Sequence, residues 1–199
     1  MKALRCSLVV SLIPIVFGAV PLAAVDVHDT RMLSEPAVSA THVAFAYADD
    51  LWIAALGDGP LQARRLTSHP GRESNPRFSP DGEWLAFSAH YDGNVDVYLV
   101  AVAGGEPRRL TWHPDADEVL DFVAGADDEE PAVLFRSQRV SHTRRFHQLF
   151  TVPVTGGFPS QLPIPHAFKA AVSPDGGKIA YVPLREAFRQ WKNYRGGTT

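Results

Sequence analysis

Short apolar runs alternate with turn residues along most of this chain. The runs are about five to seven residues long and rich in β-branched and aromatic side chains, as in 84–89 and 96–102. An amphipathic helix needs a longer segment with apolar residues at every third or fourth position, so these runs predict β-strands. Between two of them stands the sequence SPDG at 79–82, in which the proline fixes φ and the glycine accepts a positive φ. The pattern predicts an all-β protein built from hairpins.

The same pattern recurs with a period of about 45 residues, which indicates stacked structural units. The four units are residues 35–73, 74–117, 118–167 and 168–199. One slot holds an aromatic residue in every unit: Phe45, Phe87, Phe135 and Tyr181. A later slot holds an aromatic residue in the first three units: Trp52, Tyr98 and Phe150. Each complete unit therefore reads as four short strands.

A four-stranded unit of this length is typical of a blade of a β-propeller. A blade buries both faces of its sheet, which explains why VYLVAV at 97–102 is continuously apolar. We therefore expect an all-β fold, an incomplete β-propeller of four-stranded antiparallel blades with three full blades and part of a fourth. Because the fourth unit stops after its second strand, we expect the sequence to be the N-terminal piece of a longer protein. A half-propeller that dimerises is the alternative.

The N-terminus has the pattern of a secretory signal peptide. Lys2 and Arg5 precede the apolar stretch 8–20, and Ala23-Ala24 supplies small residues for cleavage. An uncleaved membrane anchor or a buried strand is the alternative, but the stretch is short for a membrane span of about 20 residues. We expect a signal peptide at 1–24, a linker at 25–34 and a partial propeller at 35–199. The prediction is an exported, periplasmic protein with no stable membrane anchor after cleavage.

Composition and motifs exclude several kinds of chemistry. The formal net charge of −3 and the pI of about 6.2 give no basic field for nucleic acid. The single cysteine, Cys6, would leave with the signal peptide, which removes disulfides, thiolate metal sites and cysteine nucleophiles. No G-x-S-x-G turn and no glycine-rich phosphate loop is present. We expect no catalytic residue, no cofactor and no metal in this chain.

Three polar segments carry residues that could form sites, but each is better explained as a loop. His113, Asp115 and Asp117 alternate nitrogen and oxygen donors that a metal would accept, but His69 occupies the same interblade position without matching aspartates. His142 and His147 flank an arginine pair, Arg144 and Arg145, in a long hairpin. The acidic segment 125–131 is another hairpin turn. A solvated loop is the favoured interpretation in each case.

One segment near the C-terminus interleaves basic and aromatic residues and is the candidate contact site. Its members are Arg185, Phe188, Arg189, Trp191, Lys192, Tyr194 and Arg195. Such a composition stacks on flat groups and binds anionic ends of peptides. Protein contact ranks first, peptide contact second and nucleic acid a distant third.

The repeats resemble a known family. The segments NPRFSPDGEWLAFSA at 75–89 and DVYLVAVAGGEPRRLT at 96–111 resemble the repeats of TolB-like propellers and of the propellers that begin Tricorn-type proteases. The segments LTWHPDADEVLDF at 110–122 and REAFRQWKNYRGG at 185–197 are closer to the Tricorn N-terminal propeller. The resemblance covers residues 33–199.

The resemblance implies a serine peptidase as the parent protein. In that family a six-bladed N-terminal propeller precedes a second propeller, a PDZ-like domain and the catalytic domains, and the subunits assemble as an oligomer. The catalytic motifs of the family match no position here. The chain would then be a noncatalytic propeller segment that gates substrates, passes peptides and binds other domains and subunits. A TolB-like periplasmic protein-binding scaffold without enzymatic activity is the alternative. The signal peptide is a departure, since the best-known members work in the cytoplasm.

Overall fold

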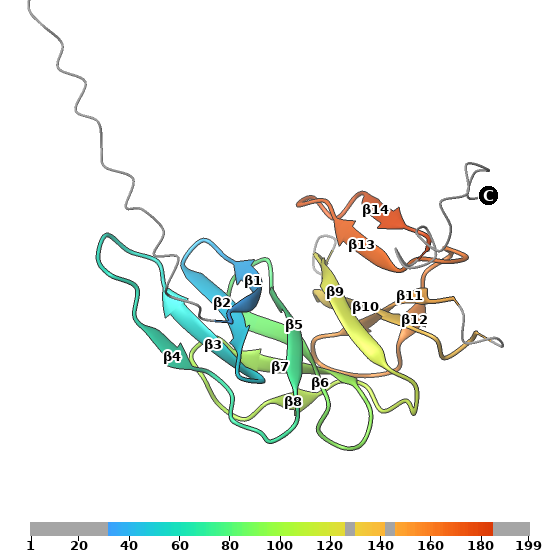
Figure 1. Cartoon of the computed structure of the whole chain (residues 1–199). Helices are drawn as coiled ribbons and strands as arrows, with labels where there is room; N and C mark the ends of the chain where they lie inside the picture. The colour runs from blue at the N-terminus through green and yellow to red at the C-terminus, as the bar shows by residue number, and fades with distance from the viewer. Residues whose placement is uncertain (1–31, 126–129, 142–145, 185–199) are drawn as a thin grey trace, which may run out of the picture. The chain divides into compact units, whose positions relative to one another are not determined.

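The regular structure of the described chain consists of strands alone. The structure is a computed structural model that describes residues 32–125, 130–141 and 146–184. Within these ranges the strands form three four-stranded sheets and one two-stranded sheet, all antiparallel, and no helix is present (Figure 1). The all-β propeller class is therefore confirmed, in an open arrangement that does not close into a ring within these ranges. No helix in the described ranges is long and apolar enough to cross a membrane.

Each sheet is one blade, with its strands in sequence order. Blade one contains β1 (Ser34–Val38), β2 (His42–Tyr47), β3 (Asp50–Ala55) and β4 (Ala63–Arg65). Blade two contains β5 (Glu73–Phe78), β6 (Trp84–Ala89), β7 (Asp96–Ala101) and β8 (Arg108–Arg109). Blade three contains β9 (Asp117–Val123), β10 (Ala132–Ser137), β11 (Gln148–Pro153) and β12 (Ser160–Gln161). The described part of blade four contains β13 (Lys169–Val172) and β14 (Ile179–Val182).

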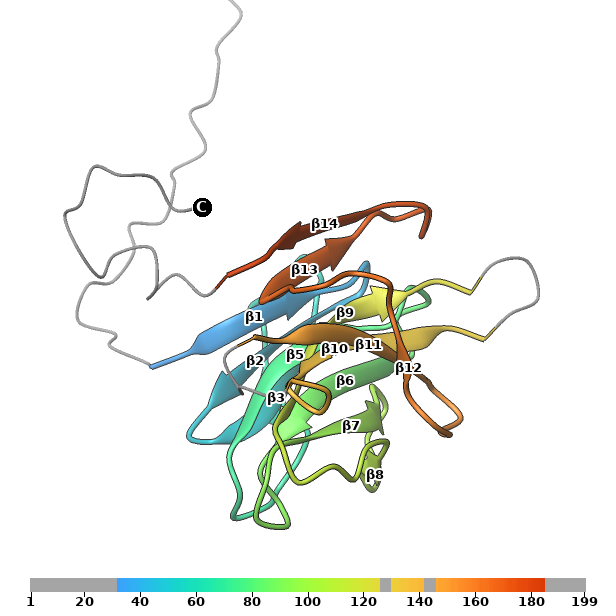
Figure 2. The ribbon, with the colours of Figure 1, turned by 90° about the vertical axis from the view of Figure 1, so that its right-hand side faces the viewer.

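The first strand of each blade contacts the first strand of the next. β1 packs beside β5, β5 beside β9, and β9 beside β13 (Figures 1 and 2). These four strands are edge strands of their sheets, because each pairs only with the second strand of its own blade. They form the inner side of the propeller, where a propeller has its central passage.

Three blades begin one residue earlier than the sequence units. β1 begins at Ser34, β5 at Glu73 and β9 at Asp117, whereas the units begin at 35, 74 and 118. For β5 and β9 the physical reason is a backbone hydrogen bond. The N–H of Glu73 donates to the carbonyl of Asp49 at 3.0 Å, and that of Asp117 to Val95 at 2.8 Å. The acidic residue that closes a sequence unit thus starts the next blade.

The aromatic slots of the repeat coincide in space. Phe45 lies opposite Trp52, Phe87 opposite Tyr98, and Phe135 opposite Phe150 in the pairing of the second and third strands. The rings of the second and third pairs stack, with centroids 5.8 and 5.7 Å apart. Aromatic pairs at such distances stabilise a sheet beyond the area that they bury. The period read from the sequence is therefore the true structural period of the blades.

The apolar core lies between consecutive blades. One cluster joins blades one and two around Leu51, Leu85 and Phe87, and a second joins blades two and three around Leu99 and Phe135. Residues 96–100 of β7 are all buried, which confirms the expected burial of both faces of a blade. The cluster that joins blades three and four contains fewer fully buried residues: Leu134, Leu149 and Ala167.

Candidate functional site

The predicted contact segment cannot be placed in the fold. Arg185, Phe188, Arg189, Trp191, Lys192, Tyr194 and Arg195 all lie outside the described residues. So do His142, Arg144, Arg145 and residues 126–129 of the acidic turn. The candidate site in the described structure therefore consists of other residues.

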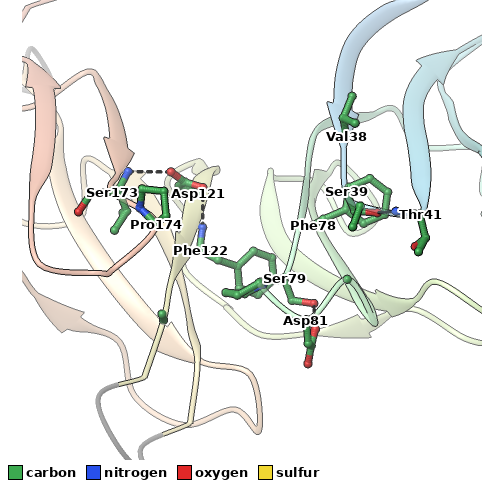
Figure 3. Close-up of a pocket in the computed structure, with 15 residues that line it drawn as sticks. Val38, Ser39, Thr41, Phe78, Ser79, Asp81, Asp121, Phe122, Ser173 and Pro174 are labelled. Carbon is green, nitrogen blue, oxygen red and sulfur yellow. Dashed lines mark hydrogen bonds between the residues drawn. The ribbon is translucent and has the colours of Figure 1, made fainter. Parts of the chain in front are cut away.

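A cavity of about 500 Å³ lies where the inner strands end in their hairpin turns. Residues 38–41 of blade one and 78–82 of blade two line one side of it, and residues 121, 122 and 124 of blade three and 172–174 of blade four contribute to the other (Figure 3). Four successive blades therefore meet around one hollow. We call it the mouth cavity, because it lies at the end of the inner strands.

The SPDG turn supplies part of this wall and is internally bonded. The Ser79 hydroxyl donates to the Asp81 carboxylate and accepts the backbone N–H of Trp84 at 2.9 Å. Asp81 Oδ1 accepts the N–H of Glu83 at 3.0 Å, and Gly82 has a φ of 74°. These bonds define the turn, because they hold both ends of the hairpin together.

The second SPDG turn repeats this geometry in blade four. Ser173 donates to Asp175 and accepts the N–H of Lys178 at 2.9 Å, while Asp175 accepts the N–H of Gly177 at 3.1 Å. The serine and aspartate of both turns are thus engaged in the same structural bonds. The recurrence identifies them as turn residues of the blades.

The wall of the mouth cavity combines apolar side chains with hydroxyl and carboxylate groups. Hydroxyl groups of Ser39, Thr41 and Ser173 and the carboxylates of Asp81 and Asp121 lie among its lining residues, none of which is Lys, Arg or His. The hydrogen bond from the Ser79 hydroxyl holds the pKa of Asp81 below its usual value. The cavity therefore offers hydrogen-bond acceptors and negative charge beside apolar surface.

Side chains link the inner strands across the blade boundaries. The N–H of Asn75 on β5 donates to Glu35 of β1, and Arg77 Nε donates to the carbonyl of Leu120 on β9 at 2.8 Å. Asp121 on β9 in turn accepts the N–H of Val172 on β13 at 2.8 Å (Figure 3). These links satisfy backbone groups on the open edges of the inner strands, which otherwise would need water. They fix the strands that surround the mouth cavity.

A cluster of polar side chains, buried except for Arg65, joins blade one to the start of blade two. Arg65 at the end of β4 pairs with Asp50 at the start of β3, at 2.8 Å. The N–H of Leu51 donates to Thr67 Oγ1 at 3.0 Å and to Glu73 Oε2 at 2.9 Å. The Thr67 hydroxyl donates to the same carboxylate. We call Asp50, Arg65, Thr67 and Glu73 the first clasp.

The next blade boundary repeats the cluster. Arg109 pairs with buried Asp96 at 2.5 Å, and the N–H of Val97 donates to Thr111 Oγ1 at 3.0 Å. The Thr111 hydroxyl approaches Asp96 Oδ1 at 3.3 Å. Asp117 occupies the position of the glutamate of the first clasp. We call Asp96, Arg109, Thr111 and Asp117 the second clasp.

Burial sets the protonation behaviour of the clasp carboxyl groups. It raises the pKa of Glu73 above the ordinary 4.5, and it raises the pKa of Asp96 and of Asp117 above 3.8. The guanidinium groups of Arg109 and Arg139 beside the two aspartates oppose this effect without cancelling it. Such buried, hydrogen-bonded groups hold a fixed geometry, which suits a structural joint.

The third blade boundary lacks a clasp. The corresponding residues are Gln148, Gln161, Pro163 and Ala167. The buried Oε1 of Gln148 has no hydrogen-bond partner in the described part of the chain. Instead, Arg136 of β10 donates to the carbonyl of Phe168 at 2.6 Å, and its guanidinium lies 3.9 Å from the Phe168 ring centroid. Blade four is therefore attached to blade three by contacts that differ from the clasps at the first two boundaries.

His113 and His69 each bond the backbone of an interblade loop. His113 Nδ1 accepts the N–H of Asp115 at 3.1 Å, and His69 Nδ1 accepts the N–H of Gly71 at 3.0 Å in the preceding loop. Asp117 is buried and pairs with Arg139. In the described ranges no group of three His, Cys, Asp or Glu side chains is placed to hold a metal ion. His147 lies edge-on to the Phe168 ring, beside the attachment of blade four.

Sequence reasoning missed the clasps, although a signal was present. The segment RRLT recurs at 64–67 and 108–111, each time with an aspartate at the start of the preceding strand and an acid six residues after the threonine. From the sequence, these residues are predicted only to form the fourth strand. The hydrogen bonds and ion pairs between these residues are visible only in the structure, where the acid that ends one unit starts the next blade.

Comparisons with known proteins agree with this architecture. A family model described as the Tricorn protease N-terminal beta propeller domain matches residues 30–199. The tricorn protease homolog 2 of Streptomyces coelicolor is 35% identical over 173 residues, which cover 82% of this chain and 14% of that protein. A Tricorn-like protease N-terminal subunit of Sulfurisphaera tokodaii is 27% identical over 168 residues, which cover 82% of this chain and 80% of the subunit. This chain thus spans 14% of the length of the first relative and most of the second.

Solved structures share the fold. The crystal structure of the tricorn protease matches with a TM-score of 0.61 and 22% identity, over 72% of this chain and 14% of that chain. TolB from Acinetobacter baumannii matches with a TM-score of 0.55 and 21% identity, over 76% of this chain and 37% of that chain. At these identities the likeness concerns the fold alone.

Proposed function

Because this chain belongs to the Tricorn protease N-terminal beta propeller family, we propose that it is a noncatalytic propeller segment of an exported Tricorn-like serine peptidase. It would admit or pass extended peptides and bind other parts of the assembly. Hydrolysis would belong to other domains. The two serines of the SPDG turns support this division, because their hydroxyl groups are engaged in turn bonds.

The observation that carries the proposal is the mouth cavity. Four successive inner strands converge on it, and hydroxyl and carboxylate groups line it. An extended peptide carries unpaired backbone N–H donors and apolar side chains, and both suit a wall that combines acceptors with apolar surface. A folded protein has already paired most of its backbone groups. The cavity is therefore suited to unfolded chain.

Export is part of the same proposal and rests on the first 24 residues. The positive start, the apolar stretch and the small residues at 23–24 support a secretory signal. Cell fractionation tests it: the protein is expected in the periplasm without residues 1–24. Recovery in the cytoplasm with Met1 retained would contradict export.

Peptide binding tests the passage. We expect the 199-residue chain to bind fluorescein-labelled unstructured peptides of about 10 and 20 residues, which extend to about 33 and 66 Å. Ala40 lines the mouth cavity and is exposed, so Ala40→Trp narrows it and is expected to weaken binding about tenfold. Gln62→Trp, on the exposed β3–β4 loop, is the matched control. Equal affinity of both variants would refute the passage, as would equally tight binding of a folded protein.

A TolB-like scaffold that binds folded protein partners is the second candidate, and the shared fold favours it. The downstream reading frame discriminates the two. A PDZ-like segment followed by a serine peptidase domain supports the peptidase, whereas a stop codon after a few more blades supports the scaffold.

A further inference from the structure

Four aspartate-glycine pairs occur in this chain, and the structure describes all of them. They are Asp58-Gly59, Asp81-Gly82, Asp92-Gly93 and Asp175-Gly176. At such a pair a chain can rearrange its own backbone, because the nitrogen of the glycine can attack the side-chain carboxyl carbon of the aspartate. Glycine favours this attack, since it has no Cβ that crowds the nitrogen. Whether a pair reacts therefore depends on how the fold holds these two groups.

The rearrangement needs only water. The glycine nitrogen loses its proton and bonds to Cγ of the protonated carboxyl group, while the C–OH bond breaks and one water molecule leaves. The product is a succinimide ring. Water that then adds to the α-carbonyl and breaks its bond to the nitrogen leaves isoaspartate, in which the chain runs through the side-chain carbons and the α-carboxylate is free. No oxidant, reductant or cofactor takes part.

The pairs in the two SPDG turns are restrained by hydrogen bonds. The N–H of Gly82 donates to the carbonyl of Ser79 at 2.9 Å. The Asp81 carboxylate accepts the Ser79 hydroxyl and the N–H of Glu83. The bond from Ser79 holds the pKa of Asp81 below its usual value, so that less of the reactive protonated form is present. The turn of blade four repeats these bonds and the lowered pKa of its aspartate.

An ion pair restrains the pair in the β6–β7 loop. The Asp92 carboxylate bonds Nη1 of Arg109 at 2.9 Å, and Arg109 is itself fixed to the buried Asp96 of the second clasp. This contact restricts the rotation that brings Cγ of Asp92 to the nitrogen of Gly93. The Asp92 side chain is 66% exposed, so its restraint is weaker than that of the turns.

The pair Asp58-Gly59 has no such restraint. In the ranges that the structure describes, neither the Asp58 carboxylate nor the Gly59 N–H has a hydrogen-bond or ion-pair partner. Both residues are exposed in the loop between β3 and β4. A Cβ added at Gly57 or at Gly59 would meet no atom within 4 Å, so nothing packs against the loop there. The carboxyl group can therefore rotate toward the nitrogen without breaking a contact.

Blade one can absorb the rearrangement. Isoaspartate adds one atom to the path of the backbone, and this atom falls within the loop, because the pairing of β3 with β4 ends at Ala54 and Ala63. Surface loops tolerate additional length at little cost. The new α-carboxylate would lie in solvent, where an enzyme could reach it.

We propose that Asp58 is a modification site, at which the folded chain converts aspartate to isoaspartate faster than at its three other aspartate-glycine pairs. The product belongs to a defined chemical class, the isoaspartyl α-carboxylate, which an isoaspartyl carboxyl methyltransferase accepts with S-adenosylmethionine as methyl donor. This site goes beyond the proposed function, because Asp58 belongs neither to the mouth cavity nor to the clasps.

Incubation of the folded 199-residue chain in heavy-oxygen water tests the proposal. Each cycle of ring formation and opening places one heavy oxygen in the residue, and mass spectrometry of peptides locates it. Radiolabelled methyl transfer by an isoaspartyl methyltransferase identifies the isoaspartyl form. We expect the peptide with Asp58 to gain label at least about fivefold faster than each of the others, because each restraining bond slows the reaction by about that factor.

Two variants alter the reacting groups without disturbing the blade. Asp58→Glu keeps the negative charge, but its longer side chain would have to close a larger ring, so the label at this position is expected to be lost. Gly59→Ala fits the loop, because its Cβ meets no atom within 4 Å, yet the methyl group crowds the nitrogen. It is expected to slow labelling at Asp58 and to leave the other three pairs unchanged.

Ser79→Ala is the converse variant. It removes the hydroxyl group that restrains Asp81 and is expected to raise labelling at Asp81 about fivefold, while Asp58 serves as the unchanged internal reference. The urea-unfolded chain supplies the remaining control. The restraining bonds are absent there, so the four rates are expected to approach one another.

Three results would overturn the proposal. The first is label spread evenly over the four pairs of the folded chain. The second is unchanged labelling at Asp58 in Gly59→Ala. The third is an equal lead of Asp58 in the urea-unfolded chain, since local sequence and not the fold would then select the site.

Discussion

Glu73 joins two blades through one carboxylate. It is 1% exposed and accepts hydrogen bonds from the Leu51 N–H, the Thr67 hydroxyl and the Tyr91 hydroxyl. Burial outweighs these bonds and raises the pKa of Glu73. The protonated form is thus more favoured in the folded chain than in the unfolded one. A group of this kind adds stability below its unfolded pKa, and the contribution is lost as the pH rises through the folded pKa.

Comparison of the wild type with Glu73→Gln measures this effect. Glutamine keeps the shape of the side chain and cannot ionise, and the other titrating groups cancel in the difference. The free energy of unfolding of the wild type is expected to rise relative to the variant as the pH falls from 8 toward 4.5, the ordinary pKa of glutamate. Urea unfolding at several pH values is the measurement. A difference that stays constant or changes in the opposite direction would show that Glu73 ionises normally.

For single residues, the sequence predicted the hairpin turns better than the contacts between blades. The SPDG turns and the aromatic slots follow from local chemistry, because Pro80, Asp81 and Gly82 act within one hairpin. The repeat places Glu73 at the end of a unit and indicates no role for it. Its partners Leu51 and Tyr91 lie 22 residues before it and 18 after it, so no local pattern reveals the bonds.

Among the elements, the short outer strands β4 and β8 do more than complete their sheets. Each carries an arginine that pairs with the aspartate at the start of the neighbouring strand. The two pairs differ in exposure: the side chain of Arg65 is 46% exposed and that of Asp50 11%, against 20% for Arg109 and 1% for Asp96. An exposed pair contributes little, whereas breaking a buried pair leaves an uncompensated charge.

The matched variants Arg65→Gln and Arg109→Gln test this difference. Arg109→Gln is expected to lower the free energy of unfolding by about 3 kcal/mol, because it leaves the buried Asp96 carboxylate without its charged partner. Arg65→Gln is expected to cost about 1 kcal/mol or less. Chemical denaturation gives both values. Equal losses would mean that burial does not govern the strength of the clasps.

The sequence predicted the strands of each blade and left their attachment unknown. Period, turn residues and apolar runs together determine a four-stranded blade. The sequence also shows that blades three and four lack a clasp, because Gln148 and Ala167 replace the acids there. The sequence alone does not show that the corresponding acids hold consecutive blades together at the first two boundaries.

For the whole molecule, the inner strands and the interblade joints have separate tasks. The inner strands converge on the mouth cavity, which supports a passage for extended peptide. The interblade joints hold consecutive blades together through the two clasps. Sequence reasoning placed the contact site instead at 185–195, which lies outside the described residues, so that prediction still stands as a prediction.

Peptide hydrolysis tests the central claim most directly, namely that this chain is the noncatalytic propeller part of a serine peptidase. A fluorogenic unstructured peptide is offered to the purified 199-residue chain and to the protein isolated from its native cells. The account predicts no hydrolysis by the chain, and hydrolysis by the native protein that a serine-reactive fluorophosphonate blocks. Hydrolysis by the chain alone, or a native protein without peptidase activity, would contradict it.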